Sequence, residues 1–435
     1  MNPKKLLTAT VVIMLISLIF PSINTVGATE TEDSYLIEDV PYVSQFPGHC
    51  FWACLEMIYR FYGFTDLNQT ELSVLQGQSY NLVYQPSTEC IGHSPLNKPL
   101  YKYRVLYTAF SNQGNEDIEF LADLLGFEVK NYNARNDGLT PIRSWNDYWT
   151  KVKQEISNNT PLITVVDMYV WPPQVELLNI SLLTSIFIRG GHSVLIVGYN
   201  ETNNTVCVHD PNPGDAGHSE KVTYYWVSLD VFKRAVRRAY WSVTAASNYD
   251  LYVPKKVSEP RSIDDIFRLC HERNIEKMKG NKSAYDADFI APNFDTFGID
   301  AWKQLKDDYE HDFLSLLPFY RISNKLFGIP LGRAIFSFNN EVTVAKEVVA
   351  YLQKAANILE NESLQNICMY EFDLFYNKSI KLEELTNLTR TLDEKIYERF
   401  LLKAYQESSL VIQDICSKID EIISIEEQII AGPSD

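Results

Sequence analysis

The stretch from Gln45 to Gly63 constrains the fold more than any other, because it places a cysteine where a helix is expected to begin. A Pro-Gly pair predicts a turn just before Cys50. Apolar residues then recur at roughly helical spacing as far as Phe61, and Gly63 supplies a stop signal. Cys50 is therefore expected near a helix N-terminus, where the partial positive charge of the helix end favours the nucleophilic thiolate.

Three further residues complete a candidate site around this cysteine. Gln45 could donate a side-chain N–H to the oxyanion that forms when the thiolate adds to a carbonyl. One strand is predicted to open at His192 and a second to end at Asp210 before a proline, with a turn between them. This hairpin would bring both residues to one edge of a sheet, where Asp210 orients His192 and His192 activates Cys50.

These motifs resemble a known family. Gln45, Cys50 and the helix after it, the run Gly-His192-Ser-Val-Leu-Ile-Val-Gly and the later Asp210-Pro pair resemble the papain-like cysteine peptidases related to those that cleave double-glycine leader peptides from bacteriocins. This resemblance implies a papain-like α+β fold. Phe51 departs from the pattern, because these peptidases usually carry a small residue there. The shape of the oxyanion site and cleft therefore stays open.

A second resemblance overlaps the first. His49-Cys50, residues 77–84 and the helical tail from Leu331 onward are similar to proteins like the butirosin-biosynthesis acyltransferase H. It implies the same papain-like core with a different acceptor for the acyl group.

The predicted chemistry is nucleophilic acyl transfer. Cys50 attacks an amide or thioester carbonyl, Gln45 and the backbone N–H of Cys50 hold the oxyanion, and His192 protonates the leaving group. Release by water makes a peptidase or amidase that acts on a peptide or a small acyl or amide compound, and release by an amine makes an acyltransferase. A third possibility, kept open by Phe51, is an inactive binding module on a papain-like fold.

No cofactor or metal is expected. His209, Asp210 and His218 lie close together in sequence, but their spacing matches no zinc pattern. His209 also alternates with Asp210 along a strand and should point to the opposite face.

The N-terminal residues predict export. Residues 1–28 combine two lysines, an apolar run from Leu6 to Phe20 and a small-residue cleavage site, which is typical of a secretory signal, although an uncleaved membrane anchor is the alternative. Residues 29–36 are a short polar linker. The chain has a net charge of −17, and this acidity argues against nucleic acid and anionic lipid as partners.

Cysteines and asparagines leave further alternatives. Seven cysteines in an exported chain fit either three disulfides with Cys50 as the free thiol, or several buried thiols, and a pair with Cys90 is one option for Cys50 or Cys54. Glycosylation is possible at Asn-x-Ser/Thr sites, which occur at Asn68, Asn158, Asn179, Asn200, Asn203, Asn281, Asn361, Asn377 and Asn387.

Two domains are predicted. Residues 37–257 form the papain-like domain, with an antiparallel sheet and an N-terminal nucleophile helix, and residues 258–435 form an all-α domain for covering, docking or dimerisation. The boundary falls at Pro254–Pro260. Residues 161–166 predict a central strand, 79–110 read as irregular structure around the cleft, and 171–189 read as either a lid or a core helix.

Overall fold

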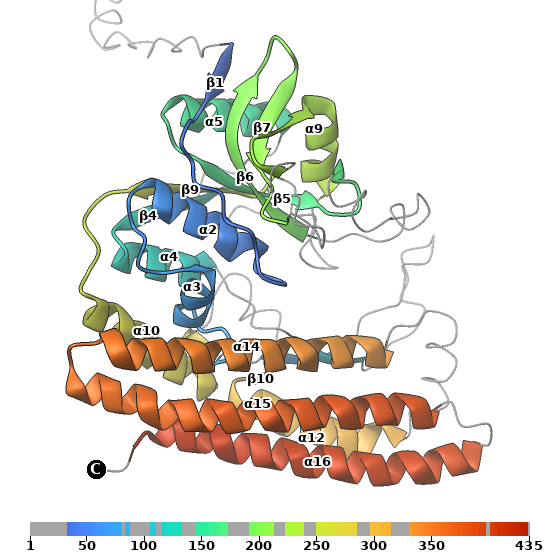
Figure 1. Ribbon diagram of the computed structural model, residues 1–435. Coiled ribbons are helices and arrows are strands. Elements are labelled where there is room, and N and C mark those ends of the chain that lie inside the picture. Colours follow the sequence, from blue (N-terminus) through green and yellow to red (C-terminus); the bar gives the residue numbers. More distant parts are fainter. Residues whose placement is uncertain are drawn as a thin grey trace, which may run out of the picture.

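An antiparallel sheet organises the N-terminal half of the protein, as the computed structural model shows (Figure 1). Within the described residues its order is β4-β9-β5-β6-β7-β8, and β1 pairs with the part of β6 that lies beyond β5. The strands are β1 Ser34–Leu36, β4 Phe127–Tyr132, β5 Leu162–Asp167, β6 Gly191–Asn200, β7 Thr205–His209, β8 Tyr225–Ser228 and β9 Leu251–Lys256. The structure describes residues 33–80, 83–87, 105–109, 115–132, 142, 144–172, 191–212, 222–238, 249–284, 296–314, 330–396 and 401–433.

Two sequence predictions about this sheet are confirmed. β5 lies in the interior of the sheet, between β9 and β6, as its continuous apolar sequence indicates. β6 and β7 form the expected antiparallel hairpin, with Asn200 opposite Thr205 at the turn. The hairpin therefore sets His192, near the start of β6, beside the residues that follow β7.

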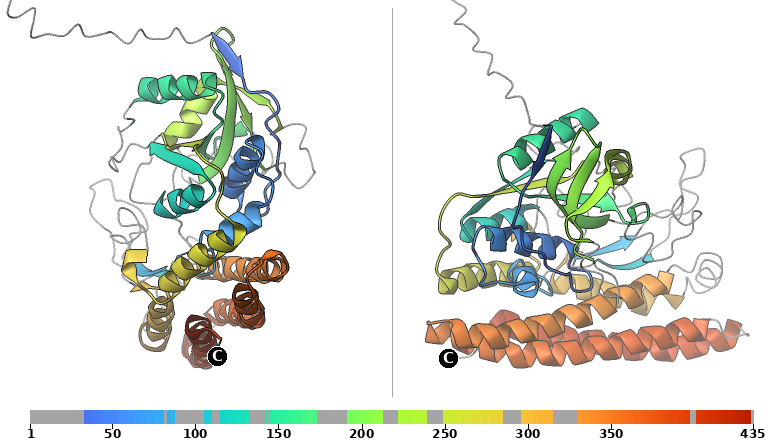
Figure 2. Two further views of the ribbon diagram at one scale, coloured as in Figure 1. Left: turned by 90° about the vertical axis from the view of Figure 1, so that its left-hand side faces the viewer. Right: turned by 45° about the horizontal axis from the view of Figure 1, so that its top comes forward.

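Helices cover both faces of the sheet (Figure 2). Thr164 accepts a hydrogen bond from Tyr148 on α5, whereas its neighbour Ile163 is paired with Tyr252, whose ring meets Phe51 on α2. Because successive strand residues point to opposite faces, α2 and α5 lie on opposite sides of β5. The helices are α2 Cys50–Phe61, α3 Gln69–Leu75, α4 Asn115–Leu124, α5 Trp145–Ser157, α9 Leu229–Arg238, α10 Ile263–Met278, α12 Ile299–Asp307, α14 Pro330–Ile358, α15 Glu362–Ile396 and α16 Leu401–Ala431, with single turns at Lys282–Ala284 and Asp308–Asp312.

The C-terminal half is dominated by three long helices, α14, α15 and α16, which run side by side beneath α3 and α10 (Figures 1 and 2). A buried cluster that includes Trp302 and Ile419 lies within this half. The larger hydrophobic core crosses between the halves, because it joins residues of α2 and the sheet to Phe267 on α10, Tyr351 on α14 and Phe375 on α15. The long helices therefore share the core of the sheet and are not a separately packed layer.

Four expectations about the outline of the fold need correction. The end of the predicted linker 29–36 is regular, because β1 Ser34–Leu36 pairs with β6. Part of the stretch 79–110 is regular, because β2 Val83–Ser87 and β3 Val105–Ala109 pair with each other, and tyrosine favours strands as well as loops. The C-terminal half is not entirely helical, because β10 Thr296–Phe297 adds to β2. Pro254 lies inside β9 and not in a linker. β5 pairs only with Leu251 and Tyr252 of that strand, so the missing N–H of the proline costs no bond to β5.

The cysteines of the described residues are free thiols, so the interpretation with three disulfides is wrong. All of them except Cys50 are buried within one of the two hydrophobic clusters, which hold a thiol without a bridge. Residues 1–28, Cys90, His218 and all but the first two positions of 171–189 lie outside the described residues. No helix within the described residues has the length and apolar character needed to cross a membrane.

Candidate active site

Cys50 is the first residue of α2 and is half-buried. Gly48 adopts a φ of 81°, which lets the chain turn sharply, and the N–H of His49 closes the turn on the carbonyl of Phe46 at 2.9 Å. Met57, Ile58 and other apolar residues then bury α2 against β6. The thiol therefore sits at the positive end of a helix whose direction is fixed by the core.

His192 and Asp210 are in direct contact. Nε2 of His192 lies 2.7 Å from Oδ1 of Asp210, and the Asp210 side chain is completely buried. Two further donors complete its surroundings: the backbone N–H of Asn212 reaches Oδ1 at 2.9 Å, and the indole N–H of Trp171 reaches Oδ2 at 2.8 Å. A buried carboxylate with this many donors stays ionised and holds the imidazole in one orientation.

The pKa values of these groups describe an ion pair. Burial alone would raise the pKa of Asp210, but the charge and hydrogen bond of His192, with Asn212 and Trp171, lower it. Burial alone would lower the pKa of His192, but Asp210 and then Cys50 raise it to about 10. Burial also opposes ionisation of Cys50, yet the hydrogen bond and charge of His192 and the N–H of Ser193 lower the pKa of the thiol. Both shifts favour a Cys50 thiolate beside a protonated His192.

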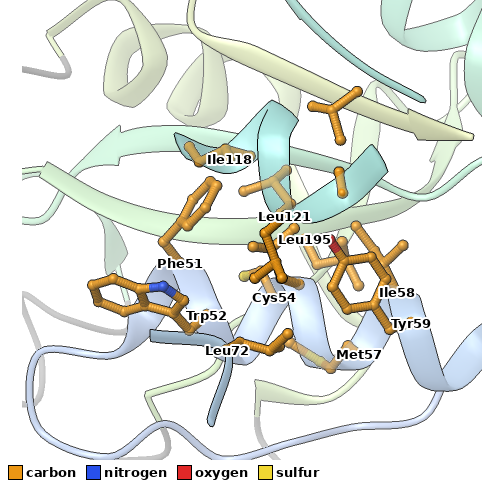
Figure 3. Packing of buried hydrophobic residues seen from close by; sticks show 14 of the residues in the cluster. Phe51, Trp52, Cys54, Met57, Ile58, Tyr59, Leu72, Ile118, Leu121 and Leu195 are labelled. Carbon is orange, nitrogen blue, oxygen red and sulfur yellow. The ribbon is translucent and has the colours of Figure 1, made fainter. Parts of the chain in front are cut away.

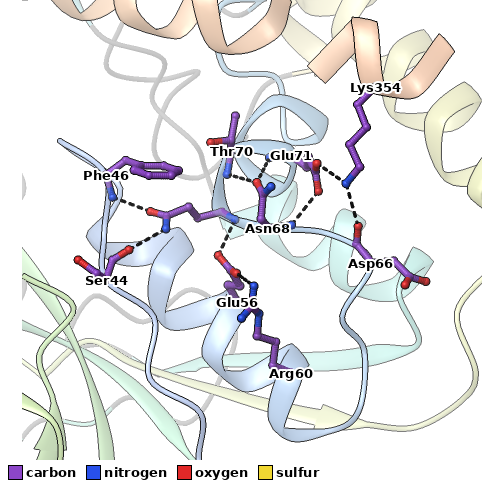
Figure 4. A network of polar contacts seen from close by, with 10 residues as sticks. Ser44, Phe46, Glu56, Arg60, Asp66, Asn68, Thr70, Glu71 and Lys354 are labelled. Carbon is purple, nitrogen blue, oxygen red and sulfur yellow. Dashed lines mark hydrogen bonds and ion pairs between the residues drawn. The ribbon is translucent and has the colours of Figure 1, made fainter. Parts of the chain in front are cut away.

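Gln45 lies between Ser44 and Phe46, which are both held by hydrogen bonds (Figure 4). Its backbone N–H donates to the carbonyl of Pro211 at 2.7 Å, next to Asp210. The flanking residues bond to the buried side chain of Gln69, whose amide donates to Ser44 O at 2.9 Å and accepts from Phe46 N at 2.8 Å. Oε1 of Gln45 is buried and has no hydrogen-bond partner within the described residues. The loop thus places Gln45 beside the β6–β7 hairpin, and the side-chain oxygen of Gln45 takes no part in holding the loop.

Phe51 is packed in the hydrophobic core (Figure 3). Its ring meets Tyr252 of β9 edge-on at 5.1 Å and lies near Ile118 of α4. The bulky residue is accommodated because the sheet and α4 leave room for an aromatic ring at this place. The side chain that departs from the peptidase pattern thus serves the core.

His209 lies apart from the candidate site. Its Nδ1 accepts the backbone N–H of Tyr224 at 3.1 Å, and its ring packs against Tyr224 and Tyr42. Burial lowers its pKa to about 4, so the ring is neutral. Within the ranges that the structure describes, no group of three His, Cys, Asp or Glu side chains is placed to hold a metal ion.

Sequence reasoning did not find Trp171 and Gln69 as parts of this site. Trp171 lies just after β5 and is completely buried, and Gln69 is the first residue of α3. A tryptophan beside prolines and a glutamine at a helix start have structural explanations in most chains. Only the fold brings them to Asp210 and to the Gln45 loop.

A helix that begins at a cysteine, packs on an antiparallel sheet and lies beside a histidine bound to a buried aspartate is a papain-like arrangement. Residues 37–245 match the model of the Peptidase_C39 like family, and this relates the chain to the papain-like cysteine peptidase superfamily. A comparison with curated proteins gives no match.

Proposed function

We propose that this protein is a papain-like thiol hydrolase, a peptidase or amidase, that works through an acyl-enzyme on Cys50. The observation that carries the proposal is the contact of His192 with the buried Asp210, together with a lowered pKa for the Cys50 thiol and a pKa of about 10 for His192. A thiolate paired with an imidazolium is both a ready nucleophile and a ready proton donor.

In the proposed first half-reaction, the sulfur of Cys50 bonds to the carbonyl carbon of an amide. The oxyanion is held by the backbone N–H of Cys50 and the side-chain amide of Gln45. The C–N bond then breaks, and the proton of His192 goes to the leaving amine. Asp210 keeps the ring oriented while its charge changes.

In the second half-reaction, water gives a proton to His192, and its oxygen bonds to the thioester carbon. The C–S bond breaks, the acid product is released, and the ionised Cys50–His192 pair is restored. An amine in place of water would give an acyltransferase by the same steps. Because the matched family is one of peptidases, hydrolysis is the function proposed first.

We place this activity outside the cytoplasm, because residues 1–28 carry the pattern of a secretory signal. Residues 37–257 supply the chemistry in this proposal, and residues 258–435 support it.

The test is incubation of the full-length chain with a mixture of peptides and small amides, with products and the protein followed by mass spectrometry. The proposal expects cleaved products and a transient acyl adduct on the Cys50 peptide, both absent in Cys50→Ala. Products that form only when an amine acceptor is added identify an acyltransferase. Products that persist in Cys50→Ala exclude both.

A further inference from the structure

His49 ties the start of the nucleophile helix to the rest of the molecule. It is the residue before Cys50, and its carbonyl accepts the N–H of Ala53 at 2.9 Å in the first turn of α2. Its side chain makes no capping bond to the amides of that turn. A movement of His49 would therefore move Cys50 and the backbone N–H groups beside it.

The imidazole of His49 is held by one polar contact and two aromatic rings. Its Nε2 lies 3.1 Å from Oε2 of Glu347, and the side chain is only 2% exposed. The centre of its ring lies 6.2 Å from the ring centre of Phe46 and 5.2 Å from that of Trp52. Nδ1 is buried without a hydrogen-bond partner in the part of the chain that the structure describes. Oε2 of Glu347 is also without a hydrogen bond among the described residues, so the carboxylate meets this ring at ion-pair distance only.

Glu347 comes from the other half of the chain. It lies on α14, outside residues 37–245 that match the peptidase family. Two turns further along the same face of α14, Lys354 pairs with Glu71 of α3 and donates to the carbonyl of Asp66 (Figure 4). α14 is therefore docked against α3, and Glu347 is the point at which it reaches the residue before Cys50.

We propose that Glu347 is a positioning residue for Cys50 and acts through His49. The carboxylate fixes the His49 ring, the ring fixes the turn from Phe46 to His49, and the turn fixes the thiol toward His192. The long helices then contribute to the reactive geometry and not only to the core. This inference rests on the proposed function, because it gives a role in preparing the same thiolate.

The experiment measures iodoacetamide labelling of Cys50 against pH in the full-length chain, by mass spectrometry of the Cys50 peptide. Glu347→Gln keeps the shape of the side chain and removes its charge. We expect labelling at pH 6 to slow by about tenfold and the pH profile to shift upward, because small displacements of reacting groups have effects of this size. Near-UV circular dichroism verifies that the variant is folded.

Glu371→Gln is the matched control. Glu371 on α15 forms a second buried His–Glu pair, with His271 at 2.7 Å, and accepts the Tyr80 hydroxyl at 2.9 Å, away from the nucleophile. It should lower the melting temperature at least as much as Glu347→Gln and leave the labelling profile unchanged. In a His49→Asn background, Glu347→Gln should add no further slowing, because the path through His49 is already broken.

The outcomes separate this inference from the proposed function. If wild-type labelling is slow at pH 6, or is unaffected by His192→Ala, both fail. If wild type labels fast, His192→Ala is slow and Glu347→Gln equals wild type, the inference is overturned and the hydrolase stands. Equal slowing by Glu371→Gln, or additive slowing with His49→Asn, also overturns the inference.

Discussion

Nε2 of His192 lies 2.7 Å from Oδ1 of Asp210, although His192 is near the start of β6 and Asp210 follows the end of β7. The pairing of β6 with β7 brings the start of one strand to the end of the other, so the contact follows from the hairpin register. Since Nε2 faces Asp210, Nδ1 is left for Cys50. The candidate site is therefore built from the start of β6, the residue after β7 and one helix end.

Asp210→Asn should shift the activity of the enzyme toward lower pH. Without the carboxylate charge, the pKa of His192 falls from about 10 toward its ordinary value of 6.5, so the proton needed by the leaving group is lost at lower pH. We expect kcat/KM at pH 8 to drop by about 10²-fold. The measurement is the pH profile of product formation, and an upper limb that stays near wild type would show that Asp210 does not hold the proton.

Gln69→Leu should reduce activity by more than its loss of folding stability accounts for. The leucine fills similar space but loses the bonds to Ser44 and Phe46 that hold the loop of Gln45. We expect kcat to fall by about tenfold or more, with KM changed less, because Gln45 would act on the oxyanion.

The control for that variant is Asn68→Ala. Asn68 caps α3 through the N–H groups of Thr70 and Glu71, so its loss costs about 1 kcal/mol of stability without touching the loop. If the two variants lose equal activity at equal loss of stability, the role of Gln69 is only structural.

The candidate site residues could be predicted from the sequence more completely than the packing around them. Cys50, His192 and Asp210 could be placed because a helix start and a hairpin are local features, and the register of a hairpin is set by its turn. Phe51 could not be placed, because its partner Tyr252 lies on β9, which the proline at position 254 concealed. Glu347 and Gln69 act across the fold, where neither spacing nor composition gives a signal.

The packing of the C-terminal helices against the sheet could not be predicted from the sequence either. Helical periodicity indicated the long helices, but it could not show that Tyr351 and Phe375 complete the core of the sheet. It also could not show that Asn274 and Lys277 of α10 donate to the carbonyls of Val74 and Gln76 at the end of α3.

Deletion of residues 258–435 should therefore prevent folding of the remainder. It would expose the apolar surface now covered by α10, α14 and α15, and remove the donors that satisfy buried carbonyls of residues 74–79. We expect a truncated chain without cooperative thermal unfolding or a near-UV circular dichroism signal. A folded fragment with a reactive Cys50 would contradict the claim that the two halves share one hydrophobic core.

Stability should depend on pH through Glu341, which is buried on α14 near Lys378 and Glu426. Burial raises the pKa of Glu341 to about 7; the charge of Lys378 lowers it and that of Glu426 raises it. Because the pKa in the folded state lies above the ordinary 4.5, this contribution to stability is present below pH 4.5 and is lost as pH rises through about 7.

Glu341→Gln stays neutral and should be more stable than wild type at pH 8, by at most about 3 kcal/mol, with the difference vanishing near pH 4.5. Urea unfolding at both pH values measures it. Glu383→Gln, which removes an exposed carboxylate on α15, should change stability little at either pH. A gain for Glu341→Gln that is equal at both pH values would contradict burial of an ionised Glu341.

The most direct test of the central claim is the rate of Cys50 labelling by iodoacetamide against pH, in wild type and His192→Ala. The imidazolium holds the thiol ionised, so wild type should label fast well below about pH 8, and the mutant should be slower by about 10²-fold at pH 6. Slow labelling of wild type, or equal rates in both proteins, would contradict a thiolate activated by His192.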